Sequence, residues 1–426
     1  MCMGTNIMTK YEQLFNWIIN QIKSNHLQRG DKLPSIRHLA QQFSVSKDTV
    51  QRALKDLVRE NYIYTVPKSG YYVLNSKNKE SYQLPFTIED FHNHAFDDFH
   101  RCINDTLSNR EEFLFNYYHN SAGLDELLTA LHHYFFEQNI YQRMEDIIIT
   151  SGTQQALYIL SQMSFPNQKT TILLEEPTYS RMIDLVINLN LPVMTIKREF
   201  GKLNLNHLEN HFKNDNIKFF YTIPNLSNPL GLSYTSEEKQ QIAKLASKYD
   251  VYIVEDDYLS DFARTDQLPL HYYDTSSHII YLKSFSAILF PTLRIGATVL
   301  PHLLYPNFLK TKKLMDYDSN LIMQKALSLY LENGMFDSNK KHLQTTTYER
   351  QLIYEAWLKE LRITDYRITP NFITFKQDSE VDFATLKTIT KPLELKNAYL
   401  KSKKRQYLQI PLTSQLYEQL KKATPK

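Results

Sequence analysis

The stretch Tyr281-Leu-Lys-Ser-Phe-Ser-Ala-Ile-Leu-Phe-Pro-Thr-Leu-Arg-Ile-Gly296 decides the fold of most of this 426-residue chain. It overlaps the apolar run His278-Ile-Ile-Tyr-Leu282, whose length and composition predict a buried strand. Two hydroxyls and a guanidinium follow, from Ser284, Ser286 and Arg294. The stretch thus places polar side chains directly after a predicted buried strand.

This segment resembles the part of fold-type I aminotransferases that carries the lysine forming an imine with pyridoxal phosphate. The family pattern Ser-x-Ser-Lys is followed by an arginine that binds phosphate. Ser284 and Ser286 match it, and Arg294 stands seven residues after the lysine position, which Ala287 occupies. The resemblance therefore implies a cofactor pocket whose reacting amine is missing. Lys283, four residues earlier, is the nearest amine that could substitute.

Short apolar runs alternate with helical stretches from about residue 91 onward. Such alternation predicts a largely parallel α/β sheet, in which ligands bind beyond the carboxyl ends of the strands. The predicted strands are residues 146–150, 171–174, 218–222, 252–254 and 279–282, and the predicted helices include residues 153–164, 179–189 and 235–248.

Polar motifs follow several of these strands. Thr150-Ser-Gly-Thr-Gln-Gln155 joins a strand to a helix, where backbone N–H groups and hydroxyls form a phosphate cradle, although the same letters also cap ordinary helices. Glu255-Asp-Asp-Tyr258 places consecutive acids after another strand. A metal site is the alternative there, but no His or Cys lies close in sequence to complete it.

The aminotransferase resemblance extends through these motifs and through Pro224-Asn-Leu-Ser-Asn-Pro-Leu-Gly231. It implies that Tyr179 stacks on the cofactor ring, and that Asn228 and Tyr258 contact its phenolic oxygen. It also implies that Asp256 holds the pyridinium nitrogen and that Tyr118 reaches a partner subunit's phosphate. The implied cofactor-binding residues are Tyr118, Ser151, Gly152, Thr153, Gln154, Tyr179, Asn228, Asp256, Tyr258, Ser284, Ser286 and Arg294.

The chain departs from the aminotransferase pattern at two places that matter for catalysis. Ala287 cannot form an imine or act as the general base. Gln409, in Tyr407-Leu-Gln-Ile-Pro411, stands where the family has an arginine that binds the substrate carboxylate, and Arg405 is offset from it. We therefore expect that no residue of this chain acts in catalysis. We also expect that pyridoxal phosphate or a related phosphorylated vitamer binds noncovalently. Two alternatives remain: the pocket is empty or binds another ligand, or the alanine is an introduced substitution.

The first 75 residues have a different character. They hold ten Lys/Arg and five Asp/Glu, although the whole chain has a net charge of only +3. Apolar spacing predicts a helix over residues 11–22, a second helix capped by Ser35 and a third starting at Lys47 after Ser46. Alternating residues around Pro67-Lys-Ser-Gly70 then predict a hairpin. Two short helices at a tight turn are typical of helix-turn-helix domains.

This block resembles the GntR-type winged helix, through Gly30-Asp-Lys-Leu-Pro-Ser-Ile-Arg-His-Leu-Ala40 and Val45-Ser-Lys-Asp-Thr-Val-Gln-Arg-Ala-Leu54. The resemblance implies double-stranded DNA as a partner, with Lys68 and Gly70 in the wing. Arginine can read guanine, and Ser46, Thr49 and the helix N-terminus suit phosphate. A solvated helix face is the alternative for these charges. The candidate DNA-binding residues are Arg37, Ser46, Lys47, Thr49, Arg52, Lys68 and Gly70.

Together the motifs predict an α/β chain of two parts. Residues 1–75 form a winged helix-turn-helix, residues 76–90 a linker, and residues 91–426 a fold-type I aminotransferase-like domain with a mainly parallel sheet. A smaller C-terminal α+β subdomain covers about 305–426. This combination resembles the MocR-type subgroup of GntR regulators, which implies a homodimer. Two cysteines and no long apolar run predict a cytoplasmic protein with no membrane partner.

The leading hypothesis is a sequence-specific transcriptional regulator whose aminotransferase-like domain senses a small-molecule effector, a vitamer or an amino compound, without catalysis. One alternative is a pyridoxal-phosphate-dependent aminotransferase with a fused DNA-binding domain. Another is a dimeric repressor that needs no ligand. The sequence does not distinguish activation from repression.

Overall fold

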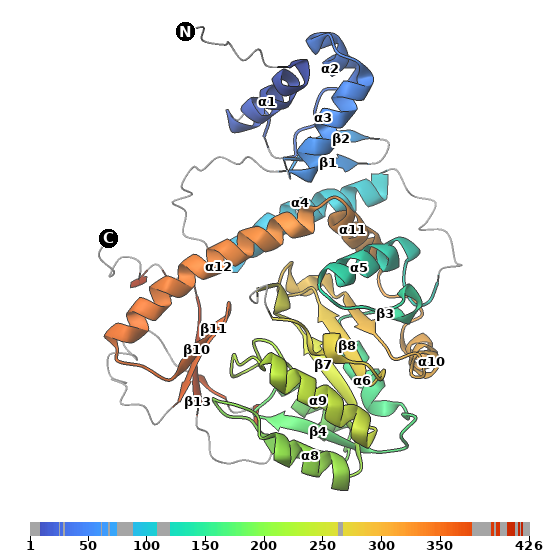
Figure 1. The fold of residues 1–426 in the computed structure, drawn as a ribbon, viewed down its shortest axis with the longest axis vertical. Helices are drawn as coiled ribbons and strands as arrows, with labels where there is room; N and C mark the ends of the chain where they lie inside the picture. The colour runs from blue at the N-terminus through green and yellow to red at the C-terminus, as the bar shows by residue number, and fades with distance from the viewer. Residues whose placement is uncertain are drawn as a thin grey trace, which may run out of the picture. The chain divides into compact units, whose positions relative to one another are not determined.

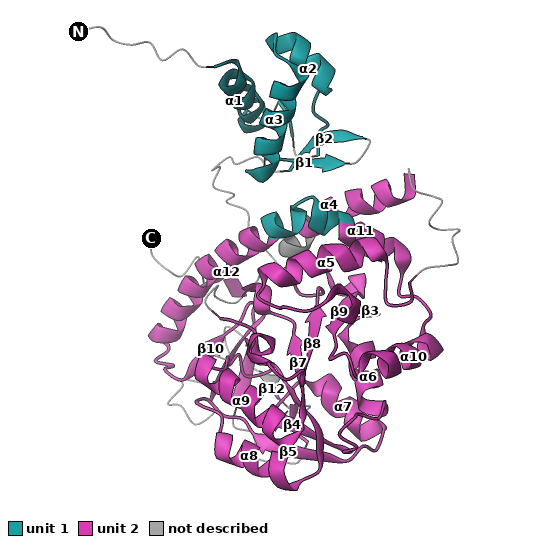
Figure 2. Ribbon diagram, turned by 45° about the vertical axis from the view of Figure 1, so that its right-hand side comes forward, with its two compact units in different colours: residues 1–84, 329–339 teal, residues 85–328, 340–426 magenta. Residues whose placement is uncertain are grey.

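The computed structural model describes residues 9–24, 26–28, 30–60, 62–66, 69–74, 88–108, 120–262, 267–376, 393–395, 398–400, 407–413, 416–417 and 419–420. The chain forms two compact units, residues 1–84 with 329–339 and residues 85–328 with 340–426 (Figure 2). The candidate residues Lys68, Tyr118 and Arg405 lie outside the described residues, as does Pro67 of the predicted hairpin. So does most of the predicted linker 76–90, although its last three residues belong to helix α4, which begins at Ile88.

The described residues between 9 and 74 fold as the predicted three helices and two paired strands (Figure 1). The elements are α1 (Lys10–Lys23), α2 (Ile36–Phe43), α3 (Lys47–Arg59), β1 (Ile63–Val66) and β2 (Gly70–Val73). Ser35 and Ser46 accept hydrogen bonds from the backbone N–H groups of His38 and Thr49, so they cap α2 and α3 as predicted. The apolar stripes of the helices meet in one core, with Leu14, Ile18, Leu39, Val50, Leu54 and Leu57 fully buried.

A seven-stranded sheet forms the centre of the second unit, with the strand order β3-β9-β8-β7-β6-β4-β5. The strands are β3 (Ile147–Thr150), β4 (Thr171–Glu176), β5 (Val193–Lys197), β6 (Ile217–Thr222), β7 (Tyr252–Asp257), β8 (Ile279–Ser284) and β9 (Gly296–Val299). All adjacent pairs are parallel except the two made by β9. The mainly parallel sheet is thus confirmed, and the five predicted strands begin within one residue of their expected positions.

Further helices lie before, between and after these strands along the chain (Figure 1), and residues 329–339 within the last two of them belong to the first compact unit. They are α4 (Ile88–Ser108), α5 (Asp125–Glu137), α6 (Thr153–Gln162), α7 (Ser180–Asn188), α8 (Leu205–Asn214), α9 (Ser236–Tyr249), α10 (Tyr305–Met315), α11 (Leu321–Glu332) and α12 (Met335–Glu360). Alpha helices 8 and 9 pack on one face of the sheet, where Leu208 and Ile242 join Phe220 and Ile253 in a buried cluster. Burying such side chains stabilises the fold by about 1.5–3 kcal/mol each.

A separate four-stranded sheet follows α12. Its strands are β10 (Tyr366–Ile368), β11 (Phe372–Lys376), β12 (Leu393–Glu394) and β13 (Tyr407–Pro411), paired antiparallel in the order β10-β11-β13-β12. This is the expected smaller C-terminal α+β subdomain, and it packs its own core around Leu358, Ile373 and Ile410.

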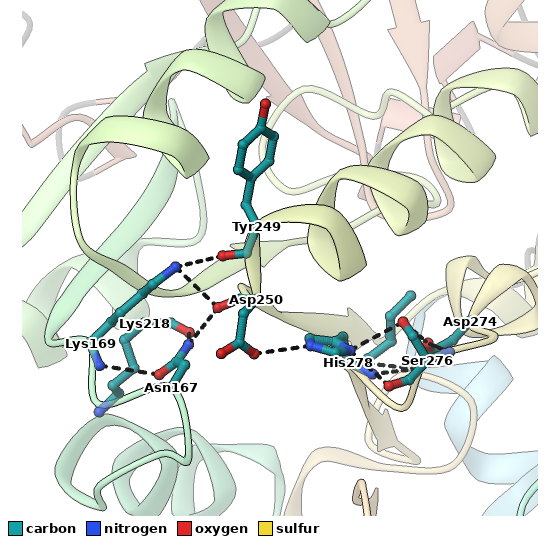
Figure 3. A network of polar contacts seen from close by, with 9 residues as sticks. Asn167, Lys169, Lys218, Tyr249, Asp250, Asp274, Ser276 and His278 are labelled. Atoms are coloured by element: carbon teal, nitrogen blue, oxygen red, sulfur yellow. Dashed lines mark hydrogen bonds and ion pairs between the residues drawn. The ribbon is translucent and has the colours of Figure 1, made fainter.

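The amino ends of the central strands are held by a polar network (Figure 3). Lys169 Nζ donates to the carbonyl of Tyr249 (2.6 Å), and the Asn167 amide donates to the carbonyl of Asp250 (2.9 Å). The Asp250 carboxylate lies 3.1 Å from Nε2 of His278. Since these residues precede β4, β7 and β8, this edge, which we call the amino edge, is fastened by direct bonds.

Candidate functional site

The carboxyl ends of the strands enclose a cavity of about 320 Å³. Ten of the twelve predicted cofactor-binding residues line it: Gly152, Thr153, Gln154, Tyr179, Asn228, Asp256, Tyr258, Ser284, Ser286 and Arg294. Ile223, Ala287, Pro291 and Asn371 complete the described lining. Residues spread over more than two hundred positions are therefore gathered at one edge, because parallel strands end on the same side of the sheet.

One side of the cavity is built for an anion. Gly152 precedes α6 with φ of +80°, and no side chain caps the first turn of this helix. A Cβ atom at this position would lie 3.1 Å from Nη2 of Arg294, so glycine lets the guanidinium approach the backbone closely. Arg294 also donates to the carbonyl of Ser151 over 3.4 Å. The positive end of the α6 dipole and this guanidinium together favour a phosphate.

Ser151 departs from the predicted cradle. It does not line the cavity, and its hydroxyl donates to Oδ2 of Asp316 at 2.5 Å. The structure thus gives this hydroxyl a partner other than a phosphate, and its contact with a phosphate stays a prediction. The reason is physical: a carboxylate is a stronger acceptor than any neutral group nearby. Asp316 comes from the connection between α10 and α11, far along the chain, and no sequence signal pointed to it.

Asp256, at the end of β7, also lines the cavity. Its Oδ2 accepts a hydrogen bond from the hydroxyl of Tyr221 (2.6 Å), whereas its buried Oδ1 has no partner among the described residues. Burial raises the pKa of this carboxyl to about 6. An unpaired buried acceptor of this kind is costly, and a protonated ring nitrogen would satisfy it. The site therefore fits a pyridine ring anchored by its N–H group.

Two tyrosines lie near Asp256. The Tyr179 side chain is partly buried in the cavity wall, and burial followed by the charge of Asp256 raises its pKa. Tyr258 donates to the carbonyl of Leu226 over 3.3 Å, and burial also raises its pKa. Both phenols therefore stay neutral near pH 7, so they can offer an aromatic face or a hydroxyl to a ligand.

The predicted DNA-binding residues lie mostly on the surface of the winged helix. Arg37, Ser46, Lys47 and Arg52 are exposed, while Thr49 and Gly70 are half-buried. The Ser46 hydroxyl serves as the α3 cap, and the Arg52 guanidinium lies 5.7 Å from the centre of the Tyr11 ring. Gly70 begins β2 with φ of +127°, a conformation that favours glycine.

Comparison with known proteins identifies both units. The model of "Bacterial regulatory proteins, gntR family" matches residues 10–73, and that of "Aminotransferase class I and II" matches residues 90–361. The uncharacterized HTH-type transcriptional regulator YcxD of Bacillus subtilis is 42% identical over 353 residues, 81% of this chain and 79% of the relative. This chain belongs to the MocR-type subgroup of GntR-family transcriptional regulators.

Other relatives agree with this assignment. HTH-type transcriptional regulator NorG of Staphylococcus aureus is 27% identical over 74% of this chain and 78% of its own length. Among solved structures, Pyrococcus horikoshii kynurenine aminotransferase in complex with PMP aligns with a TM-score of 0.66, at 20% identity. It covers 78% of this chain and 88% of that structure. An archaeal alanine:glyoxylate aminotransferase aligns with a TM-score of 0.67, at 16% identity, over 98% and 96% of the two chains. At this level of identity the structural matches establish the fold alone.

In this MocR-type regulator no lysine lines the described part of the cavity. Ala287 lies in the wall, and Lys283 points away from it. Residues alternate faces along β8, so Ser284 faces the cavity while Lys283 lies on the opposite face of the sheet. Its Nζ lies 2.7 Å from Oδ2 of Asp261 and 3.7 Å from Oδ2 of Asp257, with the side chain fully buried. Lys283 is therefore not available as a substitute for the missing amine.

The carboxylate-binding position is also changed. Gln409 does not line the cavity, and its amide donates to the carbonyl of Pro229 at 3.2 Å. In the described lining, Arg294 is the single cationic side chain and Asp256 the single anionic one. One phosphate would occupy that cation, so the regulator lacks a second positive group for an amino-acid carboxylate here. Among the described residues, no group of three or more His, Cys, Asp or Glu side chains is placed to hold a metal ion. In the same residues no helix has the length and apolarity to cross a membrane.

Proposed function

We propose that this MocR-type regulator binds pyridoxal phosphate or a related phosphorylated vitamer without covalent attachment, and that the ligand changes how a homodimer engages an operator. The observation that carries the proposal is the combination of Ala287 with ten of the predicted cofactor-binding residues in one cavity. The unpaired oxygen of Asp256 would accept the ring N–H of such a ligand. The anion site beside Arg294 would bind its phosphate. Two winged helices in a homodimer would read paired half-sites of double-stranded DNA in the cytoplasm.

Different residues of the cavity would bind the phosphate, the ring and the phenolic oxygen of the ligand. Gly152, Thr153 and Arg294 would hold the phosphate, and Ser284 and Ser286 would add hydroxyl donors. Tyr179 would cover the ring face, Asn228 and Tyr258 would meet the phenolic oxygen, and Asp256 would accept the ring N–H. When bound, pyridoxal phosphate supplies an electron-withdrawing ring. The cavity supplies no amine to move protons, so we propose sensing rather than turnover.

The first test restores the missing amine. Pyridoxal phosphate should bind the wild type reversibly, so that borohydride followed by dialysis leaves the protein mass unchanged. Ala287→Lys should instead retain one cofactor mass after borohydride, because its amine can form the covalent link. Intact-protein mass spectrometry measures both. The matched control is Ser286→Lys, which places an amine one residue away.

Two results would contradict this proposal in different ways. A wild-type protein that keeps the cofactor covalently would favour the aminotransferase alternative. A wild type that shows no thermal stabilisation with pyridoxal phosphate or pyridoxamine phosphate, yet still binds its operator, would favour the ligand-independent repressor. The thermal measurement is decisive because a ligand selective for the folded state must raise its stability.

DNA binding is tested at the start of α3. Lys47→Ala should weaken operator binding about fivefold to tenfold and reduce the slope of log affinity against log salt by about one, because one phosphate contact is lost. Arg59→Ala is the control: it removes an exposed cation from the far end of the same helix, where it pairs with Asp56. Fluorescence anisotropy with the upstream region of the protein's own gene provides the measurement. Equal losses in the two variants would argue against Lys47 as a DNA contact.

A further inference from the structure

Asp316 forms an unexpected cluster beside the phosphate cradle. Its Oδ2 accepts from the Ser151 hydroxyl (2.5 Å) and from Nε2 of Gln155 (3.2 Å). Its Oδ1 lies 3.4 Å from Nζ of Lys312, a side chain that is almost fully buried. The Oγ of Ser319 is 3.3 Å from that of Ser151. A carboxylate is thus fixed next to the residue that precedes Gly152, at the positive end of α6.

The position of Asp316 is unfavourable in two respects. It caps the C-terminus of α10, where the helix dipole favours cations over anions, so the pairing with Lys312 offsets only part of the cost. It also places a negative charge close to the site where a phosphate would bind. The contact with Gln155 and the positive end of α6 stabilise this carboxylate within the protein, yet they hold it next to the site where a phosphate would bind.

The Ser151 hydroxyl links the two anions. A hydroxyl has one hydrogen, so Ser151 can donate to Asp316 or to a phosphate but not to both. In the structure the hydrogen goes to Asp316, and Gln155 holds the Ser151 backbone N–H at 2.8 Å. While this hydrogen bond is made, the Ser151 hydroxyl cannot donate to a phosphate in the cradle.

We propose that Asp316 competes with the ligand's phosphate for the Ser151 hydroxyl, and so sets the affinity of the cradle and its selectivity for phosphorylated ligands. This inference rests on the proposed function. Phosphate binding frees Asp316 from Ser151, leaving it with Gln155 and Lys312. The connection between α10 and α11 thereby becomes responsive to occupancy of the cavity. Asp316 is a positioning residue, because it acts through Ser151.

The test uses the full-length wild type and the variant Asp316→Asn, which keeps the side-chain shape and removes the charge. Isothermal titration with pyridoxal phosphate, inorganic phosphate and unphosphorylated pyridoxal gives three affinities for each protein. We expect the variant to bind both phosphate-bearing probes about tenfold more tightly, the size of one charge-assisted hydrogen bond, and pyridoxal unchanged. In a Ser151→Ala background the same substitution should gain less than about twofold, since no shared hydroxyl remains.

Asp318→Asn is the matched control, because it removes a charge from the same connection at a residue whose described contacts do not include Ser151. An unchanged ratio of phosphate to pyridoxal affinity in Asp316→Asn would overturn the inference, and so would a gain equally large without the Ser151 hydroxyl. If the wild type binds pyridoxal phosphate and the ratio is unchanged, the proposed function stands without this device. Tight phosphate binding by the variant alone would support the competition, and binding by neither protein would overturn both.

Discussion

Replacing Asp256 by asparagine should weaken the binding of pyridoxal phosphate about a hundredfold while making the ligand-free protein more stable. The weaker binding follows from losing a charge-assisted hydrogen bond to the ring nitrogen, worth about 1.5–3 kcal/mol. The added stability follows from removing a buried charge whose Oδ1 has no described partner. Calorimetric titration measures the first effect, and urea denaturation the second.

The sign of the stability change depends on pH. Burial raises the pKa of the Asp256 carboxyl from 3.8 to about 6, so the folded state binds its proton more tightly than the unfolded state. The ionised carboxylate thus costs stability above pH 6, on the order of 3 kcal/mol, and nothing below the unfolded pKa. The advantage of Asp256→Asn should shrink as the pH falls from 7 towards 4.

Tyr221→Phe is the matched control, since it removes the hydrogen bond to Oδ2 but keeps the carboxyl group, whose pKa rises further without that bond. We expect this variant to keep most of its affinity for pyridoxal phosphate. Equal binding by the wild type and Asp256→Asn would show that the carboxylate does not hold the ring, and the proposed orientation of the ligand would be wrong.

Lys283→Ala should destabilise the protein by about 3–5 kcal/mol, because it leaves buried carboxylates without their main counter-charge. Burial alone would lower the pKa of Lys283, but Asp257 and Asp261 outweigh it and raise the pKa, which fits a charged lysine at the centre of the cluster. The same substitution should leave the borohydride result of the wild type unchanged. The midpoint of urea denaturation, followed by circular dichroism, gives the loss.

Lys340→Ala provides the comparison for Lys283. Its ammonium lies 3.4 Å from Oδ1 of Asp261 but is partly exposed, so we expect a loss of about 1 kcal/mol or less. Lys283→Met combined with Asp261→Asn should recover part of the stability by removing charges of both signs. A loss below about 1 kcal/mol in Lys283→Ala would contradict the assignment of Lys283 to a structural ion cluster.

The sequence predicted the cavity well because its residues belong to contiguous motifs. Each motif follows a strand, and parallel strands bring their carboxyl ends together whatever their distance in the chain. That is why Gly152, Asp256 and Ser284 could be assigned to one site before their positions were known. Side chains alternate faces along β8, and Ser284 was already assigned to the cavity. The sequence alone therefore indicates that Lys283 lies on the opposite face of the sheet.

Other features depend on packing that no local pattern records. Asp316 meets Ser151 across 165 positions, and Asn371 enters the cavity from the connection before β11. Strands β5 and β9 were not predicted: β9 has four residues and directly follows the phosphate-binding segment, so its apolar run was too short to stand out. The roles of Tyr118 and Lys68 stay predictions, as do the individual DNA contacts.

The hydrogen bonds at the amino edge also bear on how ligand binding can affect the rest of this protein. Residues Asn167, Asp250 and His278 tie the starts of β4, β7 and β8 together (Figure 3), and none of them lines the ligand cavity at the other ends of the strands. Because these bonds disfavour movement of the amino edge, we expect a bound ligand to displace the loops of the carboxyl edge instead. The effect of ligand binding would then be transmitted through those loops. We therefore expect mutations that uncouple sensing from DNA binding to map to these loops rather than to the amino edge.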